Sequence, residues 1–289
     1  MNKITKTVSK YPSLLKHIHK PPENLYYRGD LGILDELCIA IVGTRRPTSY
    51  GEEMVDKIVS DFSLCNVVVV SGLALGIDTF AHKAAMRYGL KTAAVLGTGI
   101  SNVYPPANRE LVEEIVQKGG VVVSEYAGDA PARDFQFPMR NRIIAGLSVA
   151  TIVIEAPEKS GALITARFAL EENREVFAVP GDVDREESCG CNKLIQNDGA
   201  RLCFCGGDVV RGLSCDQKLD FGSGGDGDCG GGGGCGGGIL EFITKRRAVH
   251  FDKLAEKSGL SAAEINKQLS MLEISGQVYS TNSGFYIRT

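Results

Sequence analysis

Six apolar segments rich in β-branched residues recur along the first two thirds of the chain, and their starts lie 25 to 30 residues apart. Each segment is continuously apolar and not alternating, which is typical of strands buried on both faces, and each gap is long enough for a crossover helix. The pattern therefore predicts an α/β fold with a doubly wound parallel sheet. The expected strands are residues 39–42, 67–70, 92–96, 121–123, 151–154 and 176–179.

Small or polar residues follow each expected strand. In such sheets ligands lie beyond the carboxyl ends of the strands, where helix N-termini present free N–H groups to anions. Candidate anion donors occur in these connections, and together they predict a groove for a polyanion at one edge of the sheet. The candidates are Arg45, Arg46, Ser71, Gly72, Arg133, Arg140, Arg142, Lys159, Ser160 and Gly161.

The segment FPMRNR, residues 137–142, combines an aromatic ring with two arginines. Phe137 could stack on a base, while Arg140 and Arg142 could each bind a phosphate through paired N–H donors. This combination favours single-stranded nucleic acid. The alternative is that Phe137 belongs to the core and both arginines cap backbone carbonyls.

Signatures of catalysis are weak. The segment VGTRRPTSYG at 42–51 lacks the second and third glycines of a dinucleotide fingerprint, and no P-loop motif occurs. Asp78 and His82 stand one helical turn apart and could pair, but a capping aspartate with a buried histidine is the simpler interpretation. We therefore expect neither an enzyme nor a cofactor.

A glycine-rich tract divides the chain, with twelve glycines among the seventeen residues 222–238. We expect a lead-in at 1–37 that packs on the core, a Rossmann-like DNA-binding domain at 38–212, a flexible linker at 213–238 and a small domain at 239–289. The small domain carries a capping box at 261–264 before Ile265, Leu269 and Leu272, then two strand-like runs around 282–284. This pattern predicts a winged helix.

Charge and composition limit the classes of partner that the chain can bind. The net charge is only −3, so affinity for nucleic acid must come from a local patch. The first 22 residues contain no signal-peptide core, and no segment approaches the roughly 18 apolar residues of a membrane span, so we expect a cytoplasmic protein that does not bind membranes. Among nine cysteines, Cys189, Cys191, Cys203 and Cys205 form two C-x-C pairs. Structural zinc sites usually use C-x₂₋₄-C spacing, so no metal is expected.

Seven motifs in order resemble the DNA-processing protein A family, also called DprA or Smf: IAIVGTRRPTSYG, VVVVSGLALGIDTFAH, AVLGTGISNVYPPAN, VVVSEY, FPMRNRIIAGLS, IEAPEKSGALITARFALEENREVFAVPGD and NKLIQNDGA. The resemblance implies an extended Rossmann-like core that binds single-stranded DNA without strong sequence preference, homodimers, and loading of a RecA-type recombinase during natural transformation. It places Arg45, Arg46, Ser71, Gly72, Phe137, Arg140, Arg142 and Lys159 at family motif positions. Leu75 stands where many members have arginine.

Two other functions compete with this interpretation. A nucleoside-phosphate hydrolase would use one phosphate in the same loops, but SGALITARFALEE only echoes the P-G-G-x-G-T-x-x-E motif of that class. A regulatory winged-helix DNA binder is disfavoured because the expected recognition helix, residues 261–273, carries Lys267 against Glu264 and Glu273. We expect this helix to contact protein or to bind DNA weakly.

Overall fold

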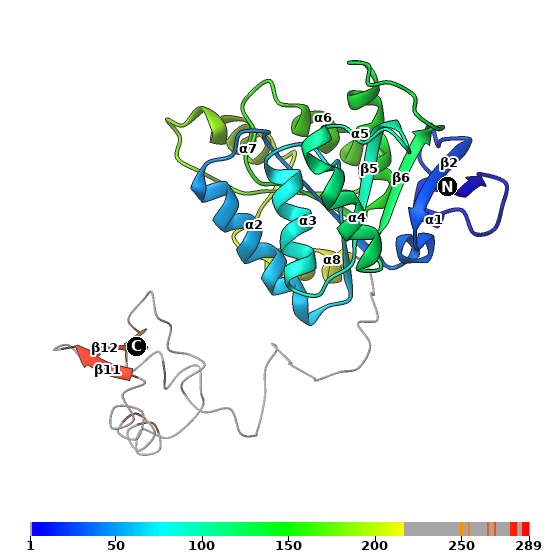
Figure 1. Ribbon diagram of the computed structural model, residues 1–289. Coiled ribbons are helices and arrows are strands. Elements are labelled where there is room, and N and C mark those ends of the chain that lie inside the picture. Colours follow the sequence, from blue (N-terminus) through cyan, green and yellow to red (C-terminus); the bar gives the residue numbers. More distant parts are fainter. Residues whose placement is uncertain are drawn as a thin grey trace. The chain divides into compact units, whose positions relative to one another are not determined.

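The computed structural model describes residues 2–216 and, farther along, residues 249–250, 254, 265, 269, 278–281 and 285–288. The chain divides into two compact units, residues 1–223 and 224–289 (Figure 1). Most of the expected linker at 213–238 lies outside the described residues. Helix α8 (Gly206–Asp216) continues past residue 212, where we expected the large domain to end.

The first unit is built on a nine-stranded sheet of the order β1-β2-β6-β5-β4-β3-β7-β8-β9. All six predicted strands are present, and they pair in parallel as expected. The parallel fold class is thereby confirmed. These strands are β3 (Leu37–Val42), β4 (Val67–Ser71), β5 (Thr92–Gly99), β6 (Val121–Tyr126), β7 (Ala150–Val153) and β8 (Glu175–Ala178).

The lead-in joins the sheet itself, which the sequence pattern did not predict. β1 (Asn2–Thr5) pairs antiparallel with β2 (Asn24–Gly29), and β2 pairs antiparallel with β6 with Tyr27 opposite Val123. The short helix α1 (Ser13–Lys16) lies between β1 and β2. At the other edge, β9 (Arg201–Leu202) adds a last parallel strand to β8.

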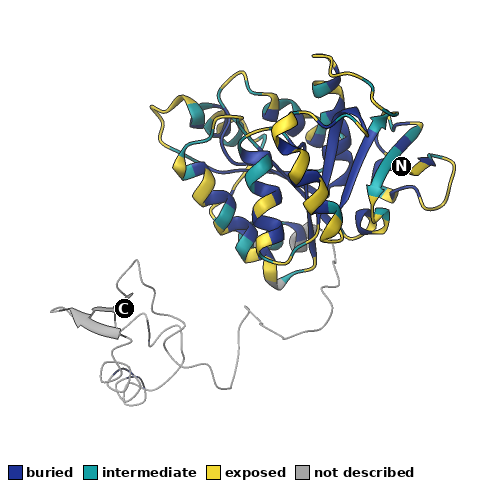
Figure 2. Cartoon of the chain, in the orientation of Figure 1, coloured by how far each residue is buried: buried dark blue, intermediate teal, exposed yellow. Residues whose placement is uncertain are grey.

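Helices cover both faces of the sheet, and the strands between them are buried (Figures 1 and 2). One core cluster joins alternate strand residues to the face that includes Ile143 and Ala166, and a second joins the other strand residues to the face that includes Val55 and Ala81. The first face carries α1, α5 (Gln136–Leu147), α6 (Gly161–Glu171) and α7 (Glu186–Gln196). The second carries α2 (Ser49–Asp61), α3 (Ile77–Arg87), α4 (Arg109–Gln117) and α8.

The strand order places a topological switch point between β3 and β7. From β3 the chain adds β4, β5 and β6 in one direction, then returns through α5 to place β7 on the other side of β3. The connections that leave β3 and β7 therefore diverge to opposite faces. A crevice forms beyond the carboxyl ends of two such strands, and it is the usual ligand position in open α/β sheets.

The described residues of the second unit agree with part of the predicted winged helix. The predicted hairpin is present as β11 (Val278–Thr281) and β12 (Phe285–Arg288), with Tyr279 opposite Ile287, and β10 (Val249–His250) pairs with β12. Leu254, Ile265 and Leu269 are helical and buried. The expected capping box and Leu272 lie outside the described residues.

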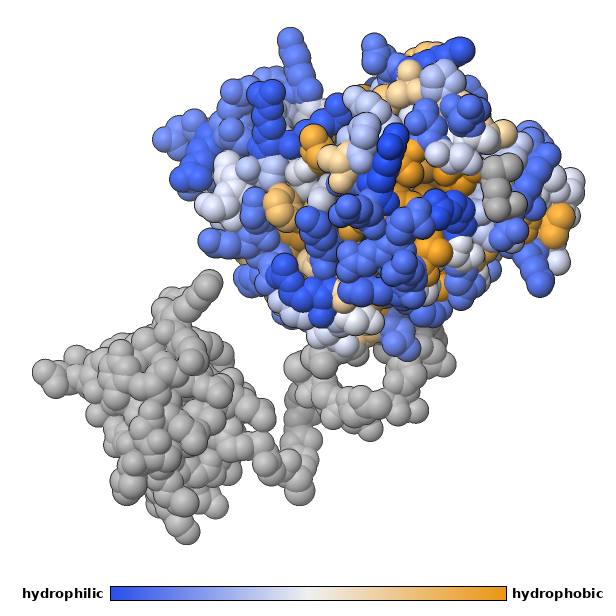
Figure 3. Space-filling model, in the orientation of Figure 1, coloured by the Kyte–Doolittle hydropathy of each residue, from blue (hydrophilic) through white to orange (hydrophobic). Residues whose placement is uncertain are grey.

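The surface of the first unit is mostly hydrophilic in the view of Figure 3, with small hydrophobic areas between charged residues. No helix in the described ranges is both long and apolar enough to cross a membrane.

Candidate nucleic-acid interface

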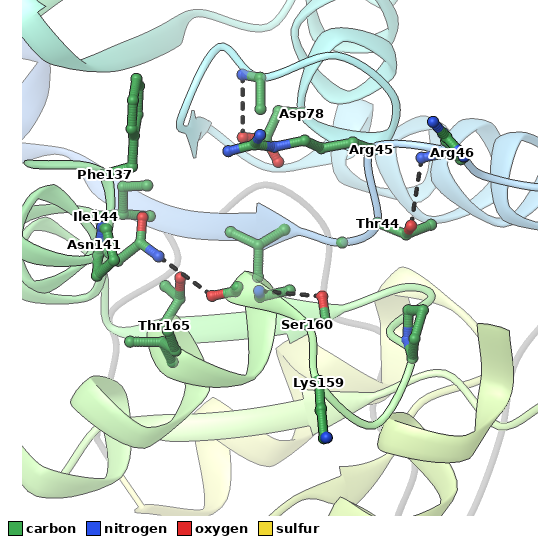
Figure 4. Close-up of a pocket in the computed structure, with 18 of the residues that line it drawn as sticks. Thr44, Arg45, Arg46, Asp78, Phe137, Asn141, Ile144, Lys159, Ser160 and Thr165 are labelled. Carbon is green, nitrogen blue, oxygen red and sulfur yellow. Dashed lines mark hydrogen bonds between the residues drawn. The ribbon is translucent and has the colours of Figure 1, made fainter. Parts of the chain in front are cut away.

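A groove of about 520 Å³ opens at the switch point. One rim is the connection from β3 to α2, and the opposite rim is the connection from β7 to α6 (Figure 4). The N-terminal half of α5 forms a wall between them. The groove thus lies at the sheet edge that the sequence pattern predicted.

The first rim presents Arg45 and Arg46. Both side chains are exposed, and neither forms an ion pair with a carboxylate of the described residues. Thr44 holds the turn, since its backbone N–H donates to the carbonyl of Glu155 at 2.7 Å and its hydroxyl accepts from the N–H of Arg46 at 3.3 Å. The rim therefore offers two cations without carboxylate partners in the described chain.

Glu155 anchors this rim from below. Its side chain is buried, and its carboxylate accepts hydrogen bonds from the N–H and the hydroxyl of Thr48, at 2.9 and 2.6 Å. A carboxylate at a helix N-terminus stabilises the first turn through the free N–H groups and the helix dipole. Glu155 also packs against Gly51, where a side chain would collide with it. Glu155 was not among the site residues predicted from the sequence.

The second rim presents Lys159, Ser160 and Gly161 at the start of α6. The hydroxyl of Ser160 caps the helix by accepting from the N–H of Ala162 at 3.3 Å, while Lys159 is exposed and extends outward from the rim (Figure 4). Gly161 has open space where a Cβ would stand. This rim combines an ammonium group with a helix N-terminus, both of which favour anions.

Asn141 and Thr165 also line the groove, and neither was predicted from the sequence. Asn141 donates to the carbonyl of Gly161 at 3.2 Å, which ties α5 to the second rim. Thr165 is nearly fully buried beside it. The available signal was helical spacing, because each residue stands four positions after an expected site residue, Phe137 or Gly161.

Phe137 lies at the end of the α5 wall. Its ring packs directly on the backbone of β5, since a Cβ on Gly97 would stand 2.8 Å from its Cδ1 atom. The guanidinium of Arg45 lies 5.9 Å from the ring centroid, and the ring of Tyr104 lies 5.5 Å away at an angle of 46°. Phe137 is only partly buried, and it lines the groove. A ring must be accessible in this way if a base is to stack on it. Tyr104 was not predicted.

Arg140 is buried under the groove. Its Nη1 group donates to the carbonyls of Gly72 and Val95, and its Nε donates to Asn141 Oδ1 at 3.1 Å. Burial lowers the pKa of Arg140 to about 10, and the nearby carboxylate of Asp78 opposes this shift. The alternative interpretation, in which an arginine caps backbone carbonyls, is therefore correct for the Nη1 group of Arg140.

Arg142 points away from the groove. Its guanidinium pairs with Glu125 through contacts of 2.6 and 2.7 Å, and the residue is buried. Residues two positions apart on a helix lie on different faces, so Arg140 and Arg142 cannot both reach one ligand from α5. The prediction that Arg140 and Arg142 each bind a phosphate did not take into account that they lie on different faces of α5.

Three other predicted contacts also lie outside the lining of the main groove. The hydroxyl of Ser71 is buried and donates to the carbonyl of Ile41 at 2.7 Å. Gly72 donates its N–H to Asp78 at 3.1 Å, and its carbonyl accepts from Arg140. Arg133 is exposed before α5. Direct DNA contact by these residues stays a prediction.

Asp78 and His82 do not form an acid-base pair. Asp78 accepts from the N–H groups of Gly72 and Ala74 at 3.1 and 3.3 Å, and burial raises its pKa. His82 shares a hydrogen bond of 2.7 Å with the hydroxyl of Thr92, and burial lowers its pKa to about 3. Both side chains support the fold, although the partner of His82 is a hydroxyl and not the backbone.

Cys38, Cys65, Cys189, Cys191, Cys203 and Cys205 are free thiols. Cys189 and Cys191 lie in helix α7, and burial raises the pKa of Cys191 to about 12. In the parts of the chain that the structure describes, no three His, Cys, Asp or Glu side chains are placed to hold a metal ion.

Acidic residues limit the charge of the groove. Asp78 lies within it, and Glu186 and Glu187, from the first turn of α7, close one end. The net charge of the lining is small, because these three carboxylates stand against Arg45, Arg46, Arg140 and Lys159. The cations therefore lie on the two rims, and α7 with its carboxylates contacts the second rim, where the N–H of Ala156 donates to the carbonyl of Glu187 at 2.8 Å.

The fold and the groove define a class: a Rossmann-like protein with a groove bordered by cationic side chains, one aromatic ring in its lining and no assembled acid-base pair among the described residues. The family model for DNA recombination-mediator protein A matches residues 2–214, and that for the DprA winged helix domain matches residues 237–282. The chain belongs to the DNA recombination-mediator protein A family, also called DprA or Smf.

Relatives agree with this assignment. Protein Smf of Synechocystis is 46% identical over 217 residues, which cover 73% of this chain and 54% of that protein. The crystal structure of DprA from Streptococcus pneumoniae matches with a TM-score of 0.69 and 43% identity, covering 73% of each chain. A structure of Helicobacter pylori DprA, described for its single-stranded DNA binding mode, matches with a TM-score of 0.67 and 31% identity, covering 75% of this chain and 97% of that one. The chain thus spans about half the length of the Synechocystis relative.

Proposed function

We propose that the chain binds single-stranded DNA along the groove and acts as a recombination mediator. One observation carries this proposal: three exposed cations without carboxylate partners in the described chain, Arg45, Arg46 and Lys159, border the same groove as a partly exposed Phe137 ring. Cationic rims hold a sugar-phosphate backbone, and an aromatic ring holds an unstacked base. The H. pylori relative, whose structure is described for single-stranded DNA binding, supports the same proposal.

The described contacts divide the predicted residues into two roles. We assign phosphate contacts to Arg45, Arg46 and Lys159, with Ser160 and Gly161 at the α6 N-terminus. Arg142, Ser71 and Gly72 instead hold the loops that shape the groove. The Nη2 group of Arg142 donates to Glu125, the hydroxyl of Ser71 donates to the carbonyl of Ile41, and the N–H of Gly72 donates to Asp78. Arg133, exposed ahead of α5, would contact DNA only where a strand leaves the groove.

No cofactor is needed for this function. Binding requires only positioned charges and a ring, and Asp78, the buried carboxylate in the groove, is engaged by two backbone N–H groups. The competing function, a nucleoside-phosphate hydrolase, would release a free base from a nucleoside monophosphate. Detecting that product would overturn the assignment as a binding protein.

The proposed function also includes two protein partners, a second copy of the chain in a homodimer and a RecA-type recombinase. The outer strand β9 carries Leu202, which is 40% exposed, and Phe204 just beyond it is 56% exposed. Exposed apolar side chains on an edge strand favour association with a second copy. We propose that the dimer acts in the cytoplasm and presents bound DNA to the recombinase. Faster RecA filament assembly on DNA coated with single-strand-binding protein would support it, and no acceleration would reject this step.

Fluorescence anisotropy with a labelled 12-nucleotide oligo-dT tests the binding step. We expect the parent protein to bind, and Phe137→Leu to bind about tenfold more weakly, because a stacked base contributes on the order of 1–3 kcal/mol. Phe135→Leu is the matched control, since Phe135 is 60% exposed and does not line the groove. Equal affinities for both variants and the parent would reject the groove as the site.

A further inference from the structure

The loop at residues 44–48 carries the two arginines of the first rim, and one residue holds it at both ends. At its start, the N–H of Thr44 donates to the carbonyl of Glu155 at 2.7 Å. At its end, the N–H and the hydroxyl of Thr48 donate to the two carboxylate oxygens of Glu155, at 2.9 and 2.6 Å. We call this segment the arginine loop.

The two ends of the arginine loop depend on Glu155 to different degrees. The carbonyl of Thr44 also accepts from the N–H of Ile77 at 3.2 Å, so the start of the loop has a second anchor. At the other end, Thr48 is the N-cap of α2, and its side chain makes no capping hydrogen bond to that helix. Loss of the Glu155 carboxylate would therefore release mainly this end, and Arg46 lies nearer to it than Arg45 does.

Glu155 affects a bound strand only indirectly. It does not line the groove and is 2% exposed, so it is not placed to touch DNA. Its negative charge stands close to the arginine loop, and by itself that charge weakens the attraction of Arg46 for a phosphate. The hydrogen bonds of the same carboxylate hold the loop. The charge and the hydrogen bonds therefore act on DNA affinity with opposite signs, and experiment can separate them.

We propose that Glu155 is a positioning residue for DNA binding, which raises the affinity by fixing the arginine loop before the strand arrives. This proposal rests on the binding of single-stranded DNA in the groove. A loop that is already fixed in its binding conformation loses less conformational entropy on binding than a mobile loop does. Without the carboxylate, the bound strand itself would have to order Arg46.

Two neutral variants of similar size separate the hydrogen bonds from the charge. In Glu155→Gln the amide oxygen can accept from the N–H of Thr48, and the amide nitrogen can donate to the hydroxyl. Glu155→Met can do neither. We expect Glu155→Gln to bind oligo-dT at least as tightly as the parent. Glu155→Met should bind about fivefold more weakly, with a log-log salt slope shallower by about 0.7, the value for one phosphate on a single strand.

The control is Asp56→Asn, which also removes a carboxylate that makes two hydrogen bonds. Asp56 belongs to α2, accepts from Arg87 and Tyr88 at 2.7 and 2.8 Å, and does not line the groove. Its loss should leave the affinity and the salt slope as they are in the parent. Urea denaturation of each variant shows that it is folded under the binding conditions.

A double-mutant cycle shows whether Glu155 acts through the arginine loop. In an Arg46→Ala background, Glu155→Met should weaken binding by less than about twofold, because the contact that it disturbs is already absent. In a Lys159→Ala background, on the opposite rim, it should keep its full effect. An equal loss in both backgrounds would mean a general effect on the fold and would overturn the positioning role.

Thr48→Val tests the same contact from the other side and does not depend on the folding of Glu155→Met. It removes the hydroxyl and keeps the N–H, so binding should weaken by about twofold, and an unchanged affinity would contradict the proposal. Equal affinities of Glu155→Gln and Glu155→Met would also overturn it and leave DNA binding in the groove intact. Failure of the parent to bind oligo-dT would instead reject the proposed function.

Discussion

Two sets of basic side chains lie at the same edge of the sheet, and their surroundings differ. Arg45, Arg46 and Lys159 are exposed and form no ion pair within the described chain. Arg140 and Arg142 are buried and donate to backbone carbonyls or to Glu125. A basic residue type and a position close to other basic residues in the chain are therefore not enough to predict a DNA contact. Whether a side chain is free to bind DNA depends on the hydrogen bonds and ion pairs that it already makes inside the protein.

The difference has an energetic basis. A buried guanidinium has lost its hydration, and only the hydrogen bonds inside the protein compensate for that loss. An exposed arginine keeps its water and its rotamer freedom until a ligand arrives. Removing a buried cation should therefore act mainly on folding, and removing an exposed one mainly on DNA affinity.

The largest expected effect follows the loss of Arg142. Arg142→Ala leaves Glu125 without its partner, and breaking a buried pair costs about 3 kcal/mol, toward the lower end of the usual range because Glu125 is partly exposed. Urea denaturation measures this loss. Arg87→Ala is the control, since its ion pair with Asp56 is exposed and contributes less than about 1 kcal/mol. Similar losses in both variants would contradict the distinction between buried and exposed cations.

The next effect is the pH dependence of stability, which we expect to come from the buried side chain of His82. The pKa of His82 is about 3 in the folded protein, below its ordinary value of 6.5. The unfolded chain therefore takes up a proton below pH 6.5 while the folded protein does not, so stability present above pH 6.5 is lost as the pH falls toward 3. Between pH 6.5 and 5 the loss should reach about 2 kcal/mol.

The pH effect is isolated by comparing urea denaturation of the parent and His82→Asn across this range. The raised pKa of Asp78 acts in the opposite direction, because its folded form takes up a proton more readily than its unfolded form. That contribution is common to both proteins. We expect a flatter pH profile for the variant, and identical profiles would show that His82 does not carry the dependence.

A smaller effect is expected at the exposed rim. Arg46→Ala should weaken binding of oligo-dT about fivefold and reduce the log-log salt slope by about 0.7, the value for one neutralised phosphate on a single strand. The free energy of unfolding should change by less than about 0.5 kcal/mol, because the side chain is exposed and has no partner in the described chain. A large loss of stability would place Arg46 with the buried set.

The smallest effect should be a gain. Glu186 is exposed at the α7 end of the groove, so Glu186→Gln removes repulsion of phosphates and should strengthen DNA binding about twofold at low salt. The gain should fade as salt is added. Anisotropy titrations at two salt concentrations measure it, and an unchanged affinity at low salt would mean that the strand does not approach α7.

Much of the fold was predictable because continuous apolar runs identify strands buried on both faces. β7 and β8 each lie one residue earlier than predicted. β1 at the sheet edge and β2 beside it were missed because both strands are only partly apolar.

The site was predictable in position but not in detail. The switch point follows from the strand order, which sequence periodicity does not reveal. Arg140 and Arg142 are buried because α5 packs against the sheet. There the carbonyls of Gly72 and Val95 and the carboxylate of Glu125 accept their hydrogen bonds. Glu155 and Tyr104 gave no local signal, since their roles arise from contacts with residues distant in the chain.

The most direct test of the central claim is the salt dependence of oligo-dT binding by a triple variant, Arg45→Ala, Arg46→Ala and Lys159→Ala. The account predicts a log-log slope shallower than that of the parent by about 2, with an unchanged urea midpoint. A slope equal to that of the parent would contradict the claim that these exposed cations hold the DNA backbone.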